Sequence, residues 1–144
     1  MTPENKKFLS RRLRDAASKQ PELKQLKTLL LQLGGDSIVA PPRTPDQDVS
    51  SLLKSGFVTS GPITLKVMKS SSCHQNIAAV WTKRRFGIVG IATGYALSED
   101  GLWRQHSWGI LREGVLETTQ AREKYFGIVL QGEKADFFAF SNSS

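Results

Sequence analysis

Residues 69–81 read KSSSCHQNIAAVW and place the only cysteine of the chain, Cys73, where a polar turn gives way to an apolar helix. Three serines precede the thiol and an apolar run follows it, so we expect Cys73 in the first turn of that helix. A thiol attacks as a thiolate, and the free N–H groups and dipole of a helix N-terminus favour that anion. The pattern makes Cys73 a candidate nucleophile, and a small buried core residue is the alternative.

A histidine is the usual partner of a catalytic cysteine, and the chain has two, His74 and His106. His74 follows the cysteine directly, and neighbours on a helix point about 100° apart, so we expect it not to turn back onto the thiol. His106 lies in LWRQHSWGIL, residues 102–111, which reads as a strand returning from an Asp-Gly turn. Strand alternation puts His106 on one face with Arg104 and Trp108, and we predict that it is the base. A half-buried histidine bonded to a carbonyl is the alternative.

A histidine base works best when a carboxylate or amide holds its second nitrogen. Glu117 lies on the next expected strand, across a short turn, so we predict that it orients His106. Strand register decides this contact, and the sequence leaves the register open. The substitutes for Glu117 are Asn76, Gln105 and Thr119. A charge at a strand edge is the alternative role for Glu117.

The remaining site candidates surround the thiol and the expected histidine strand. Backbone N–H groups near Cys73 and His74 are expected to hold an oxyanion. Arg104 is expected to meet a substrate carboxylate, and the two tryptophans are expected to line a cleft unless they belong to the core. The oxyanion and substrate-binding candidates are His74, Asn76, Trp103, Arg104 and Trp108.

The order of these parts is a thiol at a helix start, a hairpin, a histidine in the returning strand and a polar residue in the next strand. It resembles the papain-like thiol enzymes, especially their compact NlpC/P60-like branch, over about residues 69–130. Position by position, Cys73 takes the place of the nucleophile, His106 of the base and Glu117 of the orienting residue. The resemblance implies a cysteine-dependent hydrolase or acyltransferase that forms an acyl-enzyme at an amide or thioester of a peptide or small metabolite, without a cofactor.

The whole chain predicts an α+β fold, in which N-terminal helices precede a central helix that starts at Cys73 and packs on an antiparallel β-meander. Capping patterns predict helices from Thr2-Pro3 to about Lys19, from Pro21 to Gly34-Gly35, and from Thr44-Pro45 to Ser55. Strands are expected at residues 57–59, 63–68, 86–97, 102–111, 115–119, 125–130 and 136–140. Prolines near residue 41 divide the chain into a basic helical extension, residues 1–40, and an α+β catalytic domain, residues 41–144.

The net charge of +7 is concentrated in the first half of the chain. Residues 1–72 hold 12 Lys and Arg against 6 Asp and Glu, whereas residues 73–144 hold 8 against 7. This favours a second hypothesis, a non-enzymatic basic binding or adaptor protein that contacts an acidic partner or nucleic acid. The basic side chains of its first helix are Lys6, Lys7, Arg11, Arg12 and Arg14.

Several classes of site find no support in the sequence. The chain has no Gly-rich phosphate loop or dinucleotide motif, and its Cys and His lack zinc-site spacing, so we expect neither a cofactor nor a metal. No apolar run approaches the roughly 18 residues that cross a bilayer, and no signal-type region follows the basic start. We therefore expect a cytoplasmic protein, or one exported without a cleavable signal.

Overall fold

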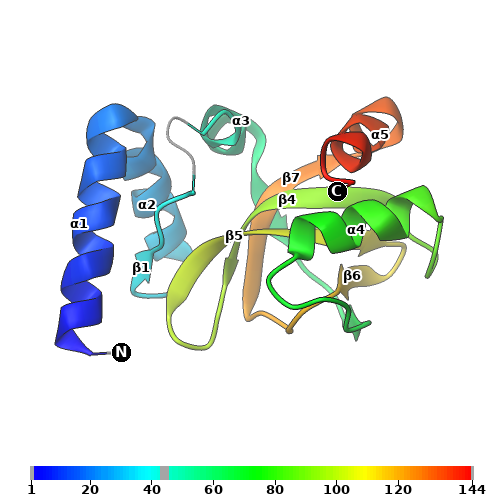
Figure 1. Cartoon of the computed structure of the whole chain (residues 1–144), viewed down its shortest axis with the longest axis horizontal. Helices are drawn as coiled ribbons and strands as arrows, with labels where there is room; N and C mark the ends of the chain where they lie inside the picture. The colour runs from blue at the N-terminus through cyan, green and yellow to red at the C-terminus, as the bar shows by residue number, and fades with distance from the viewer. Residues whose placement is uncertain (1, 43–45, 144) are drawn as a thin grey trace.

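The computed structural model describes residues 2–42 and 46–143 and has the α+β fold that the sequence predicts (Figure 1). Its helices are α1 (Pro3–Lys19), α2 (Glu22–Leu33), α3 (Asp48–Ser55), α4 (Cys73–Thr82) and α5 (Gly132–Ser141). Its strands are β1 (Ser37–Ile38), β2 (Phe57–Thr59), β3 (Ile63–Leu65), β4 (Gly90–Leu97), β5 (Leu102–Leu111), β6 (Gly114–Glu117) and β7 (Lys124–Leu130). The central helix α4 begins at Cys73, as expected.

The strands form one sheet in the order β2-β7-β4-β5-β6-β3, with β1 added beside β5. Two hairpins join β4, β5 and β6 into the expected antiparallel meander, and β7 returns to the other edge of β4. The sheet as a whole is mixed rather than antiparallel, because β1 pairs with β5 and β3 pairs with β6 in parallel. Both parallel partners come from distant parts of the chain, and the apolar pattern of a short strand does not specify its neighbour.

The expected strand at residues 136–140 is wrong, because these residues lie in α5. The apolar run was typical of a strand, but its buried residues, Ala135 and Ala139, are four apart and share one helical face. Phe137 and Phe140 stay 72% and 81% exposed on the other side. A helix buries the two alanines against α4, whereas a strand would bury alternate residues.

Other expected elements shift at their ends. The strand expected at residues 63–68 is regular only over Ile63–Leu65, and the one expected at 86–97 begins at Gly90. Phe86 has a left-handed φ of 60°, which a continuous strand does not tolerate. The helix cap expected at Thr44-Pro45 lies outside the described residues, and α3 itself ends at Ser55 as predicted.

The first two helices follow their sequence signals. Asn5 donates its backbone N–H to the Thr2 hydroxyl at 3.1 Å, which caps α1. Three leucines of α2 at helical spacing, Leu23, Leu26 and Leu30, are fully buried. They belong to one hydrophobic cluster with α1, α3 and, from the sheet, Tyr95, Leu97, Trp103 and Phe126. The expected boundary at residue 40 stays a prediction.

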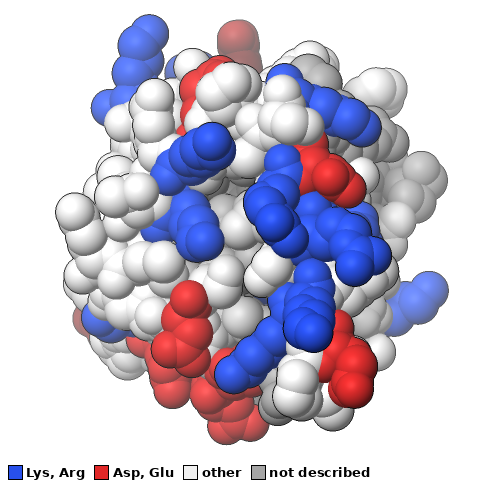
Figure 2. All heavy atoms as spheres, turned by 90° about the vertical axis from the view of Figure 1, so that its left-hand side faces the viewer, with Lys and Arg blue, Asp and Glu red and all other residues white. Residues whose placement is uncertain are grey.

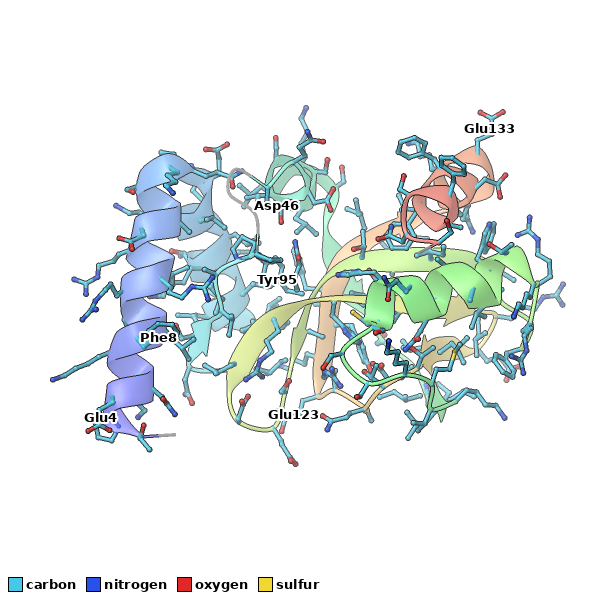
Figure 3. The ribbon with its side chains drawn as sticks, in the orientation of Figure 1. Glu4, Phe8, Asp46, Tyr95, Glu123 and Glu133 are labelled. Carbon is cyan, nitrogen blue, oxygen red and sulfur yellow. The ribbon has the colours of Figure 1, made fainter. Side chains whose placement is uncertain are left out.

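Asp46 ties the N-terminal helices to the sheet. Its backbone N–H donates to the Gln20 side chain and its carbonyl accepts from that same side chain, both at 2.8 Å, while its carboxylate accepts from Gln105 on β5. Figure 3 shows Asp46 at the start of α3, with Tyr95 below it between the helices and the sheet. These bonds hold the segment before α3 beside the middle of β5.

The two faces of the sheet have different partners. Ile91, Tyr95 and Leu97, all on one side of β4, pack against the helices, with α1 to α3 at one end and α4 and α5 at the other (Figure 1). The opposite face curls inward around Ala92, Ala96, Trp108, Val115 and Tyr125. His106 shares its side of β5 with Trp108, so it points into the curl, whereas α4 lies on the helical face.

The surface of α1 is basic. Lys6, Lys7, Arg11, Arg12 and Arg14 are all exposed, and none forms an ion pair within residues 2–42 and 46–143. Figure 2 shows Lys and Arg gathered on the side of the molecule that carries α1, with a few acidic side chains between them. Over the same described ranges, no helix combines the length and the apolar character that crossing a bilayer requires.

Candidate active site

Cys73 reaches His106 through an interruption in the pairing of β5. One edge of β5 pairs with β4 from Trp103 to Ile110. The other edge pairs with β1 at Leu102 and Trp103 and with β6 only from Gly109 onward. Among the described residues, the segment between these contacts has no strand partner on that side. The N-terminus of α4 lies at this opening, so a thiol on the helical face meets a histidine from the inner face.

The turn before α4 positions the thiol. Ser71 has a left-handed φ of 57°, and the side chain of Ser72 makes no capping hydrogen bond. The first intrahelical bond is donated by Asn76 N–H to the Ser72 carbonyl at 2.8 Å. The N–H groups of Cys73 and His74 precede that bond and therefore have no acceptor inside the helix. Free N–H groups at a helix N-terminus can stabilise a negative charge.

His106 and Glu117 form a buried pair. The Nε2 atom of His106 lies 2.8 Å from Oε1 of Glu117, and the two side chains are 3% and 0% exposed. Because Nε2 faces Glu117, Nδ1 is the nitrogen left for the hydrogen bond between His106 and the Cys73 side chain. The rings of His106 and Trp108 stack with centroids 6.0 Å apart, which fixes the plane of the imidazole.

Four donors surround the Glu117 carboxylate. His106 and the Tyr125 hydroxyl, the latter at 2.9 Å, share Oε1. The backbone N–H and the hydroxyl of Thr119 both donate to Oε2 at 2.9 Å. Each oxygen of this buried carboxylate therefore has two hydrogen-bond partners, which fix its orientation. The carboxylate in turn orients the imidazole.

These contacts shift the pKa values in a consistent direction. Burial raises the pKa of the Cys73 thiol, but hydrogen bonds and charge from His106 and His74 outweigh it and lower the pKa to about 5. Burial lowers the pKa of His106, but Cys73 and Glu117 outweigh it and raise the pKa above its ordinary value. Burial raises the pKa of Glu117, yet its bonds to His106, Thr119 and Tyr125 bring it below the ordinary value. These shifts favour the thiolate and the imidazolium over the neutral thiol and imidazole.

His74 contradicts our expectation that it would point away from the thiol. Its side chain hydrogen-bonds the Cys73 side chain and helps to lower the thiol pKa. Its Nδ1 also lies 2.6 Å from the hydroxyl of the fully buried Ser107, which donates to the Thr93 hydroxyl at 2.9 Å. The contact with Ser107 on β5 is a tertiary contact, which sequence adjacency alone did not predict.

A cavity of about 480 Å³ lies over the thiol. Its lining includes Cys73, His74, Arg104, Gln105 and His106. Its other lining residues are Val39, Ala40, Pro42, Val67, Met68, Ser70, Ser71, Thr119, Gln120 and Arg122. A cavity of this size has room for a small ligand.

Three of the predicted oxyanion and substrate-binding residues lie outside this lining. Trp103 is buried among the N-terminal helices and donates its Nε1–H to the Gly34 carbonyl at 2.9 Å. Trp108 is buried behind His106. Asn76 is buried and donates its side-chain amide to the Lys69 carbonyl at 2.7 Å, which fixes the turn before α4. Arg104 does line the cavity, although Asp100 already binds its guanidinium at 2.8 Å.

Sequence reasoning missed Tyr125 and Ser107 and assigned Thr119 only as a substitute for Glu117. A serine or tyrosine inside an apolar strand indicates one thing locally: its hydroxyl needs a hydrogen-bond partner once it is buried. The identity of that partner depends on strand pairing, and Tyr125 reaches Glu117 only because β7 and β6 lie on opposite sides of the β4–β5 hairpin in a curled sheet.

Replacing Tyr125 by phenylalanine is expected to lower the free energy of unfolding by about 2 kcal/mol, because a buried carboxylate loses a donor. Tyr95→Phe is the matched control, since the Tyr95 hydroxyl is buried without a hydrogen-bond partner in the described part of the chain. Its removal is expected to cost nothing or to stabilise slightly. Urea unfolding of both variants at pH 7 checks this, and equal losses would contradict the role given to Tyr125.

The described residues contain no cluster of three or more His, Cys, Asp or Glu side chains that would hold a metal ion. Comparisons of this chain with protein-family models, with curated protein sequences and with solved structures find no match.

Proposed function

We propose that this chain is a cysteine-dependent hydrolase or acyltransferase that acts on an amide or thioester through an acyl-enzyme on Cys73. The observation that carries the proposal is the contact of His106 with two partners, a buried carboxylate on one ring nitrogen and the Cys73 thiol on the other. A pair used only for packing would not require a thiol at a helix N-terminus that opens into a cavity.

In the proposed reaction, the Cys73 thiolate attacks the carbonyl carbon and the electron pair moves to the carbonyl oxygen. The N–H groups of Cys73 and His74 stabilise that oxyanion. When the intermediate collapses, His106 gives its Nδ1 proton to the leaving amine or thiol. Water or a second nucleophile then attacks the acyl-enzyme and loses its proton to His106, which restores the starting pair.

Each residue has the role that the papain-like resemblance implies, and Glu117 is the positioning residue. By accepting from Nε2, it keeps Nδ1 directed at the sulfur and stabilises the imidazolium. Thr119 and Tyr125 in turn donate hydrogen bonds to the Glu117 carboxylate and keep it in position. Arg104 and Arg122 supply the positive charge of the cavity wall.

Acyl-enzyme formation tests the proposal directly. Incubation with the phenyl thioester of acetic acid at pH 6 is expected to add one acetyl group to the wild-type chain, and peptide mapping is expected to place it on Cys73. Cys73→Ala is expected to remain unmodified, whereas Ser98→Ala, in the β4–β5 turn, serves as the control that behaves like the wild type. A wild-type chain that is unmodified and releases thiophenol no faster than Cys73→Ala, or acetyl groups spread over lysines, would contradict the proposal.

The adaptor hypothesis rests on a different observation, the exposed cations of α1, which form no ion pair within residues 2–42 and 46–143. It gives no account of the buried His106–Glu117 pair. It would be favoured if Cys73 is not acetylated and the wild type releases thiophenol no faster than Cys73→Ala.

A further inference from the structure

Apart from the thiol of Cys73, the ionisable side chains that line the cavity are basic. They are Arg104, Arg122 and the two histidines, and none of the described lining residues is Asp or Glu. A hollow lined by charges of one sign raises the local concentration of ions of the opposite sign. The cavity therefore favours a negatively charged ligand over a neutral ligand of the same size.

Of the two arginines, Arg104 is already paired. Its Nη1 donates to Oδ1 of Asp100 at 3.2 Å and its Nη2 to Oδ2 at 2.8 Å. This two-pronged pair uses the fork of N–H groups that would otherwise bind a ligand carboxylate. The side chain of Arg104 is also 44% exposed, so water screens its charge. These contacts make Arg104 the weaker candidate for binding an anion.

Arg122 is half-buried and has no carboxylate partner within residues 2–42 and 46–143. Its guanidinium donates instead to two uncharged oxygens, the Gln120 carbonyl from Nη1 and the Thr119 hydroxyl from Nη2, the latter at 3.4 Å. Each of these bonds uses one of the five N–H groups of an arginine. The guanidinium is therefore held at the cavity wall with its charge still available to a ligand.

Thr119 connects Arg122 to the proposed base. The Thr119 hydroxyl accepts from Arg122 and donates to Oε2 of Glu117 at 2.9 Å, and Oε1 of Glu117 lies 2.8 Å from Nε2 of His106. The guanidinium thus belongs to the same hydrogen-bond chain as the imidazole. Because Cys73 lines the same cavity of about 480 Å³, one small molecule can reach both the sulfur and Arg122.

We propose that the site acts on substrates that carry a carboxylate, and that Arg122 binds this carboxylate while Cys73 attacks the scissile carbonyl. The inference rests on the proposed function and narrows its substrates to negatively charged thioesters or amides. The planar fork of an arginine matches the two oxygens of a carboxylate. One guanidinium also balances the single charge of a carboxylate, whereas a phosphate dianion requires a second cation and Arg104 is already paired.

The test measures alkylation of Cys73 by iodoacetamides whose amide nitrogen carries a chain of one to four methylene groups that ends in a carboxylate. Each reagent is paired with the carboxamide of the same length. The thiolate sulfur bonds to the CH₂ carbon and iodide leaves, so both members of a pair react by the same chemistry and no turnover is needed. At the best length, the carboxylate is expected to react about tenfold faster than the carboxamide at pH 6.

Arg122→Gln is expected to lower the ratio of the two rate constants about tenfold, to near one. Because both reagents meet the same thiolate, the ratio divides out any general change in thiol reactivity. Arg122→Lys keeps the charge but loses the planar fork, and it is expected to give an intermediate ratio. Arg112→Gln, at an exposed arginine of the β5–β6 turn outside the lining, is the control and is expected to keep the wild-type ratio.

Three results would overturn the inference and leave the proposed function standing. The first is a ratio near one at every length in the wild type, or a ratio that Arg122→Gln leaves unchanged. The second is loss of the preference in the double variant Asp100→Asn/Arg104→Gln but not in Arg122→Gln, which would assign the carboxylate to Arg104. The third is a Cys73 that thioesters acetylate but that reacts with neither member of any pair.

The opposite failure is also distinguishable. If the carboxylate preference is found but the wild type is not acetylated and releases thiophenol no faster than Cys73→Ala, the proposed function is wrong. Arg122 would then be a carboxylate-binding residue of a cavity that holds a reactive thiol without acyl transfer.

Discussion

His106→Ala is expected to move the pH midpoint of Cys73 alkylation from about 5 to about 8.5, the pKa of a free cysteine. The hydrogen bond and charge of His106 stand first among the influences that lower the thiol pKa against the cost of burial. In the wild type the rate of alkylation rises as pH increases through about 5, because the thiolate forms there. Without the imidazolium, burial remains and the anion loses its main partner.

The measurement is the full pH profile of iodoacetamide labelling at Cys73. A thiolate of higher pKa is intrinsically more nucleophilic, so a rate at one pH underestimates the change, whereas the midpoint reports it directly. Turnover of a thioester is expected to fall about 10⁴-fold in the same variant, because the proton donor and acceptor of the reaction is gone.

A second substitution separates catalysis from folding. Alanine leaves the buried carboxylate of Glu117 without one of its donors, whereas His106→Gln places an amide NH₂ near the position of Nε2 and cannot act as a base. Both variants are expected to have the raised midpoint, and the glutamine variant is expected to be the more stable. A midpoint that stays near 5 in both variants would mean that His74 and the helix N-terminus hold the thiolate without His106.

Glu117→Gln is expected to lower turnover about 10⁴-fold while the fold is retained. The rigid backbone N–H of Thr119 must keep an oxygen acceptor, so the new amide oxygen takes the place of Oε2 and the NH₂ group faces His106. An NH₂ group at Nε2 forces the ring proton onto Nδ1. The nitrogen that should accept the thiol proton is then already protonated in the neutral ring.

The same variant is expected to lose about 3 kcal/mol of unfolding free energy, because a buried ion pair is broken on one side. The loss depends on pH with a definite sign. Glu117 has a lowered pKa, so its contribution is present above the ordinary value of about 4.3 and disappears as pH falls through the folded value. His106 has a raised pKa, so its contribution is full below about 6.5 and disappears as pH rises through the folded value.

The difference between wild type and Glu117→Gln is therefore expected to be largest between about pH 4.3 and 6.5. Urea unfolding across this range checks it. Glu113→Gln, at an exposed glutamate of the β5–β6 turn, is the matched control and is expected to be nearly neutral at every pH. A difference that stays constant from pH 3 to 8 would show that Glu117 acts through packing and not through charge.

Local signals in the sequence determined the helix starts and the central hairpin. Thr2-Pro3 opens α1, Cys73 opens α4, and Asp100-Gly101 turns β4 into β5, because caps and turn residues act over a few positions. Chain order also placed His106 and Glu117 on strands that face each other. Their contact needs only one antiparallel hairpin, but the sequence left open the register that decides it.

Tertiary structure alone decided everything that depends on which distant segments meet. Trp103 and Trp108 look alike in the sequence, yet one packs under α2 and the other behind His106, because they lie on opposite faces of a curled sheet. Long-range packing also brings the Tyr125 hydroxyl to Glu117. The same kind of packing, against α4, makes residues 132–141 a helix and not a strand. The sequence indicates that a side chain will be buried or will require a hydrogen-bond partner. Only the tertiary structure determines which residue is that partner.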